Sequence, residues 1–183
     1  ATVKHFLQMN PKLIDAYMAW EPNALDDSDA LFAGQKETGS DDKGRFLPWW
    51  YRDAERNLIL EPVGDVEDTK LLPTGVRSAE YYLCPRETNK ACVIDPAPYE
   101  LAGKMVMMTS FNAPIMVNGQ FLGIAGNDLS VDFIQDLLLK ADKDLYEGAG
   151  ELALISNNQR LVAFTKDASL IGQPASEAMD TSD

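Results

Sequence analysis

Two cysteines offer the most reactive side chains of this sequence, and they stand close together as Cys84 and Cys92. The turn-forming residues between them, 85–91, predict a hairpin that joins strands at 81–83 and 93–94. Residues placed symmetrically about such a turn can face each other, as a disulfide needs, and an oxidising compartment would allow the bond. Two reduced and unrelated thiols are the alternative, and the sequence leaves both open.

Carboxylates are concentrated in a polar segment between residues 21 and 44. Its aspartates are Asp26, Asp27, Asp29, Asp41 and Asp42. A calcium loop needs oxygen ligands in regular alternation, with a glycine at its sharp turn, and this order lacks that pattern. We therefore expect a long solvated loop. We also expect no structural zinc site, because two thiols and one distant histidine, His5, cannot fill its ligand shell.

Catalytic motifs are missing from the chain. General acid–base catalysis most often uses histidine, and the single histidine lies in the N-terminal segment. The sequence contains no nucleophile-elbow Gly-x-Ser-x-Gly, no phosphate-binding glycine loop and no His-Glu-x-x-His. We therefore expect a protein that is not an enzyme and that uses no cofactor.

The charge of the chain narrows the classes of partner. A formal net charge of -13 over 183 residues repels nucleic acid and anionic lipid, so we expect no nucleic-acid partner. It favours a cationic or neutral ligand, although a high negative charge can also serve solubility alone. No apolar run reaches the roughly 18–20 residues that cross a bilayer, and no signal peptide follows Ala1.

The elements that must position these side chains predict an α+β fold. Residues 1–10 predict the end of a helix, which Asn10-Pro11 stops. A meander of short antiparallel strands follows a turn-rich stretch at 53–80, and Asn118-Gly119 is a strong hairpin signal. The expected strands are 13–20, 81–83, 93–94, 105–110, 114–117 and 121–126.

A second unit is expected after the meander. Ser130 is a good N-cap for a helix at 131–141, with Asp132 in its first turn. A strand pair at 152–155 and 161–164 then flanks a turn. Two strands cannot make an independent core, so we expect this second module to be incomplete in the present chain.

The segment 45–52 is the most aromatic window of the sequence, and we expect it on a strand. It contains the adjacent Trp49 and Trp50, which would face opposite sides of that strand. At most one of the two indoles can therefore line a given cavity, and the other belongs to the core or the rim.

Several stretches resemble the periplasmic double-Cache domains of bacterial chemoreceptors and sensor kinases. The most specific is Ala113–Ser130, in which a hairpin ends in Gly-x-Asp-Leu-Ser before a helix. The resemblance covers about residues 10–175. The other similar stretches are Trp20–Asp26, Gly44–Arg52, Tyr81–Pro85 and Asp95–Tyr99.

The resemblance implies tandem PAS-like antiparallel sheets with flanking helices. The membrane-distal, ligand-binding module would occupy residues 1–129 and be complete or nearly so. A connecting helix and the start of a truncated membrane-proximal module would occupy 130–183. The chain would then be the periplasmic domain of a membrane-anchored receptor in the inner membrane, with a homodimer among the oligomeric states left open.

The resemblance also implies a binding site in the distal module. Carried over to this sequence, Trp50 supplies an aromatic wall, Tyr99 a second ring and Asp128 an acceptor for the ammonium group of a ligand. The arginine that reads an amino-acid carboxylate falls on Leu47 or Pro48, so α-amino acids are disfavoured. Amines, polyamines, quaternary ammonium compounds and purines are the ligand classes that remain.

Alternatives stay open for the individual residues. Trp49 is less favoured than Trp50 as the wall, and Asp128 could cap the helix after it. Tyr82 could line the cavity or cover the sheet. Arg45 is expected to pair with an acidic residue more readily than with a ligand, and Asn23 could pin its loop. The whole chain could also serve a histidine kinase or a cyclase, or be a ligand-free interaction module.

Overall fold

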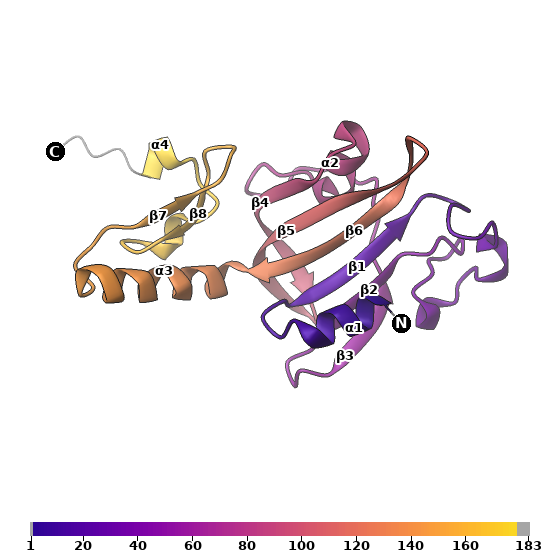
Figure 1. Cartoon of the computed structure of the whole chain (residues 1–183), viewed down its shortest axis with the longest axis horizontal. Coiled ribbons are helices and arrows are strands. Elements are labelled where there is room, and N and C mark those ends of the chain that lie inside the picture. Colours follow the sequence, from indigo (N-terminus) through magenta and orange to yellow (C-terminus); the bar gives the residue numbers. More distant parts are fainter. Residues whose placement is uncertain (1, 179–183) are drawn as a thin grey trace.

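The main layer of the protein is a six-stranded antiparallel sheet, seen in a computed structural model that describes residues 2–178 (Figure 1). Its strands run in the order β3-β2-β1-β6-β5-β4. The α+β fold class predicted from the sequence is confirmed. The six strands are β1 (Asp15–Trp20), β2 (Pro48–Arg52), β3 (Leu58–Pro62), β4 (Cys92–Leu101), β5 (Lys104–Val117) and β6 (Gln120–Ser130).

Helices cover both faces of this sheet and continue beyond it. The helix α1 (Thr2–Met9) lies on one face and α2 (Glu80–Thr88) on the other, while α3 (Val131–Tyr146) leads away from the end of β6 (Figure 1). Beside α3 lies a two-stranded sheet of β7 (Ala153–Ile155) and β8 (Leu161–Phe164), followed by α4 (Ala175–Ala178). Short 3-10 turns occupy Asp29–Leu31, Lys36–Thr38 and Ala168–Leu170.

The β5–β6 hairpin forms at the turn that the sequence predicted. Asn118 and Gly119 both have positive φ values, 51° and 79°, as a two-residue turn of the primed type requires. The two strands predicted at 105–110 and 114–117 are one continuous strand, β5, despite Pro114. Pro114 lies beyond Asn112, the last residue paired with β4, so its missing N–H costs nothing on that side.

Residues 80–88 correct the prediction, because they form a helix and not a strand. Tyr82 and Leu83 are buried on α2, so tertiary packing stabilises a short helix that contains Pro85. The disulfide between Cys84 and Cys92 is present, but it joins the middle of α2 to the start of β4 and does not close a hairpin. The two Cα atoms are 6.3 Å apart, within the range that disulfides span.

Two further elements differ from expectation in extent. The turn-rich stretch 53–80 contains β3, an edge strand paired with β2. The helix predicted at 131–141 continues to Tyr146. Its N-cap is confirmed, because the Ser130 hydroxyl accepts a hydrogen bond from the Phe133 N–H at 3.2 Å.

The smaller unit has its own contacts with α3. The Gln135 amide donates to the Phe164 carbonyl at 2.7 Å and accepts from the Phe164 N–H at 2.8 Å. We propose that a second module begins at residue 130, and residues 179–183 of that stretch lie outside the described residues. Within 2–178, no helix is long and apolar enough to cross a bilayer.

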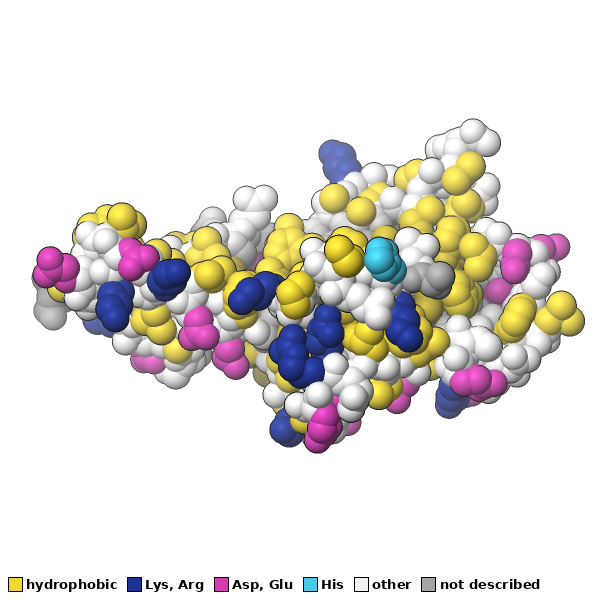
Figure 2. Space-filling model, turned by 60° about the horizontal axis from the view of Figure 1, so that its bottom comes forward, with side chains coloured by type: hydrophobic (Ala, Val, Ile, Leu, Met, Phe, Trp, Pro, Cys, Tyr) yellow, Lys and Arg dark blue, Asp and Glu magenta, His cyan; other side chains and the backbone are white. Residues whose placement is uncertain are grey.

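The two faces of the large sheet differ in chemistry. On the α1 face, the Lys4 ammonium lies 4.6 Å from the centroid of the Trp50 ring, and the Arg52 guanidinium donates to the Leu7 carbonyl. Figure 2 shows Lys and Arg side chains gathered on the face that carries α1. The opposite face carries α2 and a strap, residues 63–79, that connects β3 to α2. The acidic site described next lies on that face.

Candidate ligand-binding site

A cavity of about 280 Å³ lies between the sheet, the strap and α2. This volume suits a small metabolite, since pockets for drug-sized molecules begin near 300 Å³. The residues that line it come from five strands, the strap and one helix. They are Asp15, Tyr17, Trp49, Val63, Gly64, Asp65, Asp68, Ser78, Tyr81, Tyr99, Glu100, Met108, Ser110 and Asp128.

Two carboxylates face each other at the floor of the cavity. Asp15 on β1 is the direct cross-strand partner of Asp128 on β6, so both side chains point to the same face. Their relative exposures are 1% and 6%. Asp128 was predicted from the sequence, whereas Asp15 was missed. The sequence feature that could have indicated Asp15 is a charged residue two positions before Tyr17 on the first strand, where both side chains point inward.

The hydrogen bonds of this pair are incomplete. The Trp49 indole N–H donates to Asp15 Oδ2 at 3.0 Å, but Asp15 Oδ1 has no partner. The Tyr17 hydroxyl lies 2.8 Å from Asn112 Oδ1, to which it donates, and 3.3 Å from Asp128 Oδ1. The Tyr99 hydroxyl is also buried without a partner. Buried polar atoms nearly always find partners, so these two free atoms require an explanation.

Burial changes the acidity of both carboxyl groups. It raises the pKa of Asp128 to about 6, although hydrogen bonds with Ser110, Asp15 and Tyr17 lower it in part. Burial raises the pKa of Asp15 well above its usual value, and the neighbouring charge of Asp128 adds to that rise. Two carboxyl groups that share a buried site cannot both ionise easily.

Aromatic rings form the walls above the pair. The rings of Tyr17 and Tyr81 meet edge to face at 5.7 Å, and those of Tyr81 and Tyr99 do so at 6.3 Å. Trp49 lies 4.5 Å from Tyr51 on the same strand. Faces of this kind attract cations as well as flat heterocycles.

Gly126 explains how the Tyr17 ring reaches this position. It is the cross-strand partner of Tyr17, and a Cβ atom there would come within 2.6 Å of the ring. A glycine at 126 therefore leaves room for the ring to lie against β6, with its hydroxyl aimed at Asn112 and Asp128. The Gly-x-Asp order at 126–128 thus has a physical reason, because both residues point to the cavity face.

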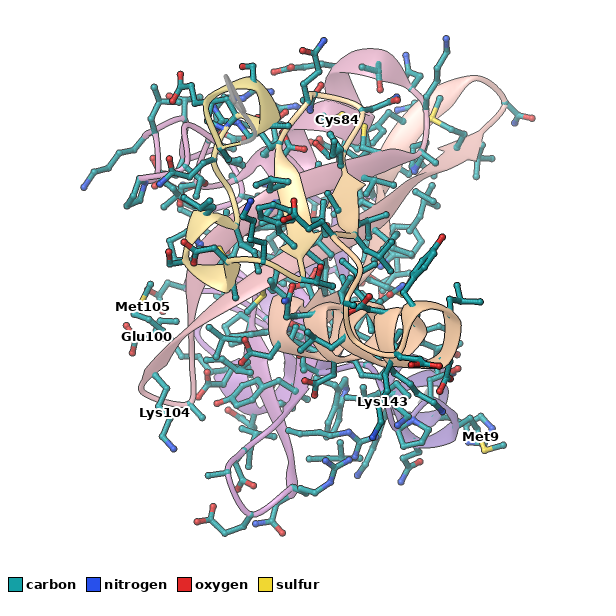
Figure 3. All side chains as sticks on the ribbon, turned by 90° about the vertical axis from the view of Figure 1, so that its left-hand side faces the viewer. Met9, Cys84, Glu100, Lys104, Met105 and Lys143 are labelled. Atoms are coloured by element: carbon teal, nitrogen blue, oxygen red, sulfur yellow. A yellow bond between two sulfur atoms is a disulfide. The ribbon has the colours of Figure 1, made fainter. Side chains whose placement is uncertain are left out.

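Further acidic residues stand on the walls and rim. Asp65 and Asp68 come from the strap, and Glu100 follows Tyr99 on β4. Figure 3 shows Glu100 beside Lys104 and Met105 at the β4–β5 hairpin, pointing outward, so its carboxylate belongs to the rim. None of the described residues that line the cavity is Lys, Arg or His. The site is therefore strongly anionic.

Two of the predicted ring assignments are corrected. Trp49 lines the cavity, whereas Trp50 lies on the opposite face under Lys4, so the preference for Trp50 was wrong. Tyr81 lines the cavity, whereas Tyr82 is fully buried outside it. The error for Tyr82 follows from the strand predicted at 81–83. These residues form a helix, and neighbours on a helix point about 100° apart. Tyr99 and Asp128 do line the cavity, as predicted.

Arg45 and Tyr82 are buried in a different group, which we call the arginine cluster (Glu21, Arg45, Glu67 and Tyr82). The Arg45 guanidinium donates to the Tyr82 hydroxyl, which donates to Glu21. Arg45 also lies 3.9 Å from the Glu21 carboxylate and 3.8 Å from that of Glu67 on the strap. The prediction that Arg45 pairs with an acidic residue is confirmed.

Asn23 lies apart from the cavity as well. Its backbone N–H donates to the Asp29 carboxylate at 2.8 Å, and its φ is 58°. Asn23 and Arg45 line a wider groove next to the strap, outside the acidic cavity. Within the described residues, no group of three His, Cys, Asp or Glu side chains could hold a metal ion.

The cavity lies on an antiparallel sheet whose last strand runs into a helix and a second unit, which is the arrangement that the resemblance to sensor domains predicted. The chain belongs to the family of methyl-accepting chemotaxis protein-like, first PDC sensor domains, whose model matches residues 1–136. The resemblance to chemoreceptor sensor domains predicted from the sequence is confirmed. The chain is accordingly an extracytoplasmic sensor domain of the type found in chemoreceptors and histidine kinases.

Individual relatives agree with this family. The chain is 32% identical over 178 residues to the methyl-accepting chemotaxis protein TlpQ of Pseudomonas aeruginosa, covering 96% of this chain and 25% of that protein. It is 27% identical to the extracellular domain of mmHK1S-Z2, assigned as a histidine kinase, with a TM-score of 0.71 and coverage of 94% and 58%.

A third relative shares the fold alone. The periplasmic sensory domain of the Campylobacter jejuni chemoreceptor Tlp1 is 14% identical, with a TM-score of 0.61 and coverage of 92% and 55%. The chain thus spans a quarter of the curated relative and little more than half of each solved structure.

Proposed function

We propose that this sensor domain binds a small ammonium compound, an amine or polyamine, in the acidic cavity. The observation that carries the proposal is the buried pair Asp15 and Asp128, which has an unpartnered oxygen and no cationic side chain among the described residues lining the cavity. Buried carboxylates are normally paired with a cation. A ligand ammonium group would supply the missing charge and the missing donors.

The surrounding rings suit the same ligand. An ammonium group that loses its water shell gains charge-assisted hydrogen bonds to carboxylates and attraction to aromatic faces. Trp49, Tyr81 and Tyr99 provide such faces around the pair. Each face adds about 0.5–2 kcal/mol when the cation is desolvated.

The polar atoms of the cavity also discriminate between nitrogen compounds. An α-amino acid carries a carboxylate, which would meet Asp65, Asp68 and Glu100 without a cationic partner. A quaternary ammonium ion has no N–H group for Asp15 Oδ1. A neutral purine would leave the carboxylate pair without a counter-charge. Primary and secondary amines carry a positive charge, have N–H groups and need no carboxylate. A polyamine could also place a second ammonium near the strap.

We also propose that occupancy is transmitted through two strands. Asp128 lies two residues before the N-cap of α3, and Tyr99 lies on β4. On β4, Asp95 accepts a hydrogen bond at 2.9 Å from Asn158 in the β7–β8 turn. A ligand that draws β4 and β6 together would bias the position of the second unit, by its difference in affinity for the two states. The output of the parent protein would be chemotaxis or, alternatively, a kinase or cyclase.

A thermal-shift screen tests the ligand class. Primary amines and polyamines are expected to raise the melting temperature, since a ligand that binds only the folded state stabilises it. Tetramethylammonium, purines and α-amino acids serve as the other arms of the screen. A rise confined to α-amino acids or purines would refute the amine proposal. Recovery of the bound amine unchanged would distinguish binding from turnover.

A further inference from the structure

We propose that the empty cavity stores a proton between Asp15 and Asp128, and that the ammonium group of the ligand displaces this proton when it binds. The sensor would then lose affinity for its ligand as the pH falls. This inference rests on the proposed function, because it concerns how the same site exchanges one positive charge for another.

The geometry of the pair supports a shared proton. The two residues are cross-strand partners on β1 and β6, and both are almost completely buried. Cross-strand partners in a sheet hold their Cβ atoms about 4.5–5.5 Å apart, so the carboxyl groups can reach each other. Trp49 supplies one hydrogen bond to Asp15, and Asp15 Oδ1 is left without any.

No nearby group among the described residues supplies the positive charge that two carboxylates need. On β1, β2 and β5 the neighbours are the hydroxyls of Tyr17 and Ser110 and the indole of Trp49. The strap contributes the carboxyl groups of Asp65 and Asp68. On α2 and β4 the neighbouring groups are the phenols of Tyr81 and Tyr99, with Glu100 at the rim.

The basic groups nearest in the fold are engaged elsewhere, two of them on the other face of the sheet. Lys4 of α1 sits over Trp50, and Arg52 is directed to the Leu7 carbonyl. Arg45 is engaged by Glu21 and Glu67 in the arginine cluster. Among the described residues lining the cavity no element therefore supplies a positive charge to the pair, and the strap and β4 add further carboxylates. Burial raises the pKa of both carboxyl groups, and the charge of Asp128 adds to the rise at Asp15.

The exchange balances in charge and atoms. Before binding, one of the two groups is a carboxylic acid that donates a hydrogen bond to the partner carboxylate, so the pair carries a single negative charge. The ligand enters as an ammonium ion and donates N–H groups to both carboxylates, and one proton leaves to solvent. The cavity loses one proton and gains one ammonium group, so its net charge is the same before and after binding.

The sign of the pH effect follows from linkage. Below the upper pKa of the pair, binding must release a proton, so the dissociation constant rises by up to about tenfold for each unit of pH lost. Above that pKa both groups are ionised before binding, and the dissociation constant becomes independent of pH. The pair titrates as a unit, so these are pKa values of the pair and not of one residue.

Calorimetry with butane-1,4-diamine as the probe tests the exchange. Its ammonium groups stay charged from about pH 5.5 to about pH 8.5, because alkyl amines titrate near the value of lysine. Titration near pH 7 in two buffers of different ionisation enthalpy should reveal the release of about one proton, with a dissociation constant that rises towards acid. The inference would be overturned if the diamine bound without releasing a proton and its dissociation constant did not change over this pH range. The amine site itself would remain.

A matched pair of variants makes the result specific. Asp15→Asn should abolish both the proton release and the pH dependence. Asp142→Asn should retain both, because Asp142 is equally buried but accepts from the Gly150 N–H in the second unit. If Asp15→Asn no longer binds the diamine, carbon-13 NMR of the carboxyl groups in ligand-free protein gives the answer. In the parent protein the resonances of Asp15 and Asp128 should both respond to the upper titration step, because that step removes the proton they share, whereas two resonances that titrate independently of each other contradict a shared proton.

Failure of the proposed function would look different. No heat with butane-1,4-diamine or butylamine at any pH in this range would remove the amine site itself, and the proton exchange with it. Binding of the diamine with no proton released removes only the exchange.

Discussion

Two polar clusters lie on the same face of the sheet, and they differ in how completely their buried groups are paired. The arginine cluster contains its own cation, so Arg45 joins Glu21, Glu67 and Tyr82 from four parts of the chain. The cavity cluster of Asp15 and Asp128 contains two acids and no cation. The first cluster is complete without a ligand, whereas the second is not.

This difference separates a stabilising site from a binding site. A buried charge with its partner holds segments together, and here it ties the strap to α2 and to the end of β1. A buried charge without a partner costs free energy until a ligand supplies one. Both clusters use a tyrosine of α2, Tyr82 in one and Tyr81 in the other. Residue type alone therefore does not tell them apart.

The largest expected effect is the loss of binding in Asp128→Ala. Truncating one partner of a buried charge pair costs about 3 kcal/mol, so affinity for butane-1,4-diamine should fall roughly 100-fold. The amine-induced rise in melting temperature should disappear while circular dichroism stays unchanged. Asp136→Ala, which removes an exposed carboxylate from α3, is the control. A full amine response in Asp128→Ala would place the ligand elsewhere.

Arg45→Ala should lower the stability of the protein and have little effect on amine binding. It leaves Glu21 and the buried Tyr82 hydroxyl without their cation, so the free energy of unfolding should fall by about 3 kcal/mol. Chemical denaturation measures this loss, with Lys43→Ala in the same loop as the exposed control. Amine affinity at a temperature where the variant is folded should change far less than in Asp128→Ala. Equal damage to binding would show that the two clusters act as one.

The stability of the ligand-free protein should depend on Asp128 in a pH-dependent way. Because the folded pKa of about 6 exceeds the unfolded value, the folded state binds more protons between about pH 4 and pH 6, and stability falls as pH rises through that window. Asp128→Asn should therefore raise the free energy of unfolding by about 3 kcal/mol at pH 8 and by little at pH 4. Urea denaturation at both pH values checks this. A variant destabilised equally at both would argue that the carboxylate is satisfied in the empty cavity.

The smallest effect distinguishes the two adjacent tryptophans. Trp49→Phe keeps an aromatic wall but removes the N–H that donates to Asp15, which should weaken amine binding by about 1 kcal/mol, or roughly fivefold. Trp50→Phe lies on the other face and should leave affinity unchanged. Calorimetry on the two variants compares them directly. Equal losses would contradict the assignment of Trp49 to the cavity.

Local signals in the sequence were enough for several parts of the fold. Asn118-Gly119 predicts its hairpin because few residue pairs adopt two positive φ values readily. Ser130 predicts the start of α3 because its hydroxyl can satisfy a free N–H of the first turn. Tyr99 and Asp128 were predicted as cavity residues only through the family resemblance, which preserves the order of its motifs.

The remaining residues of the site needed the tertiary structure. Residues 80–88 have no strong helical pattern, and burial of Tyr82 and Leu83 decides that they form α2. That choice alone determines whether Tyr81 or Tyr82 faces the cavity. The disulfide then joins α2 to β4, a contact between elements that the short spacing of its cysteines concealed.

What this sequence determined by itself was its class, through the order of its turns, caps and family motifs, because these depend on residues close in the chain. Only the tertiary structure decided that Asp15 faces Asp128, 113 positions away, and that Trp49 rather than Trp50 donates to it. Strand order and register bring distant residues to one face, and a shift of one residue would reverse every side chain. The binding site is a product of that register.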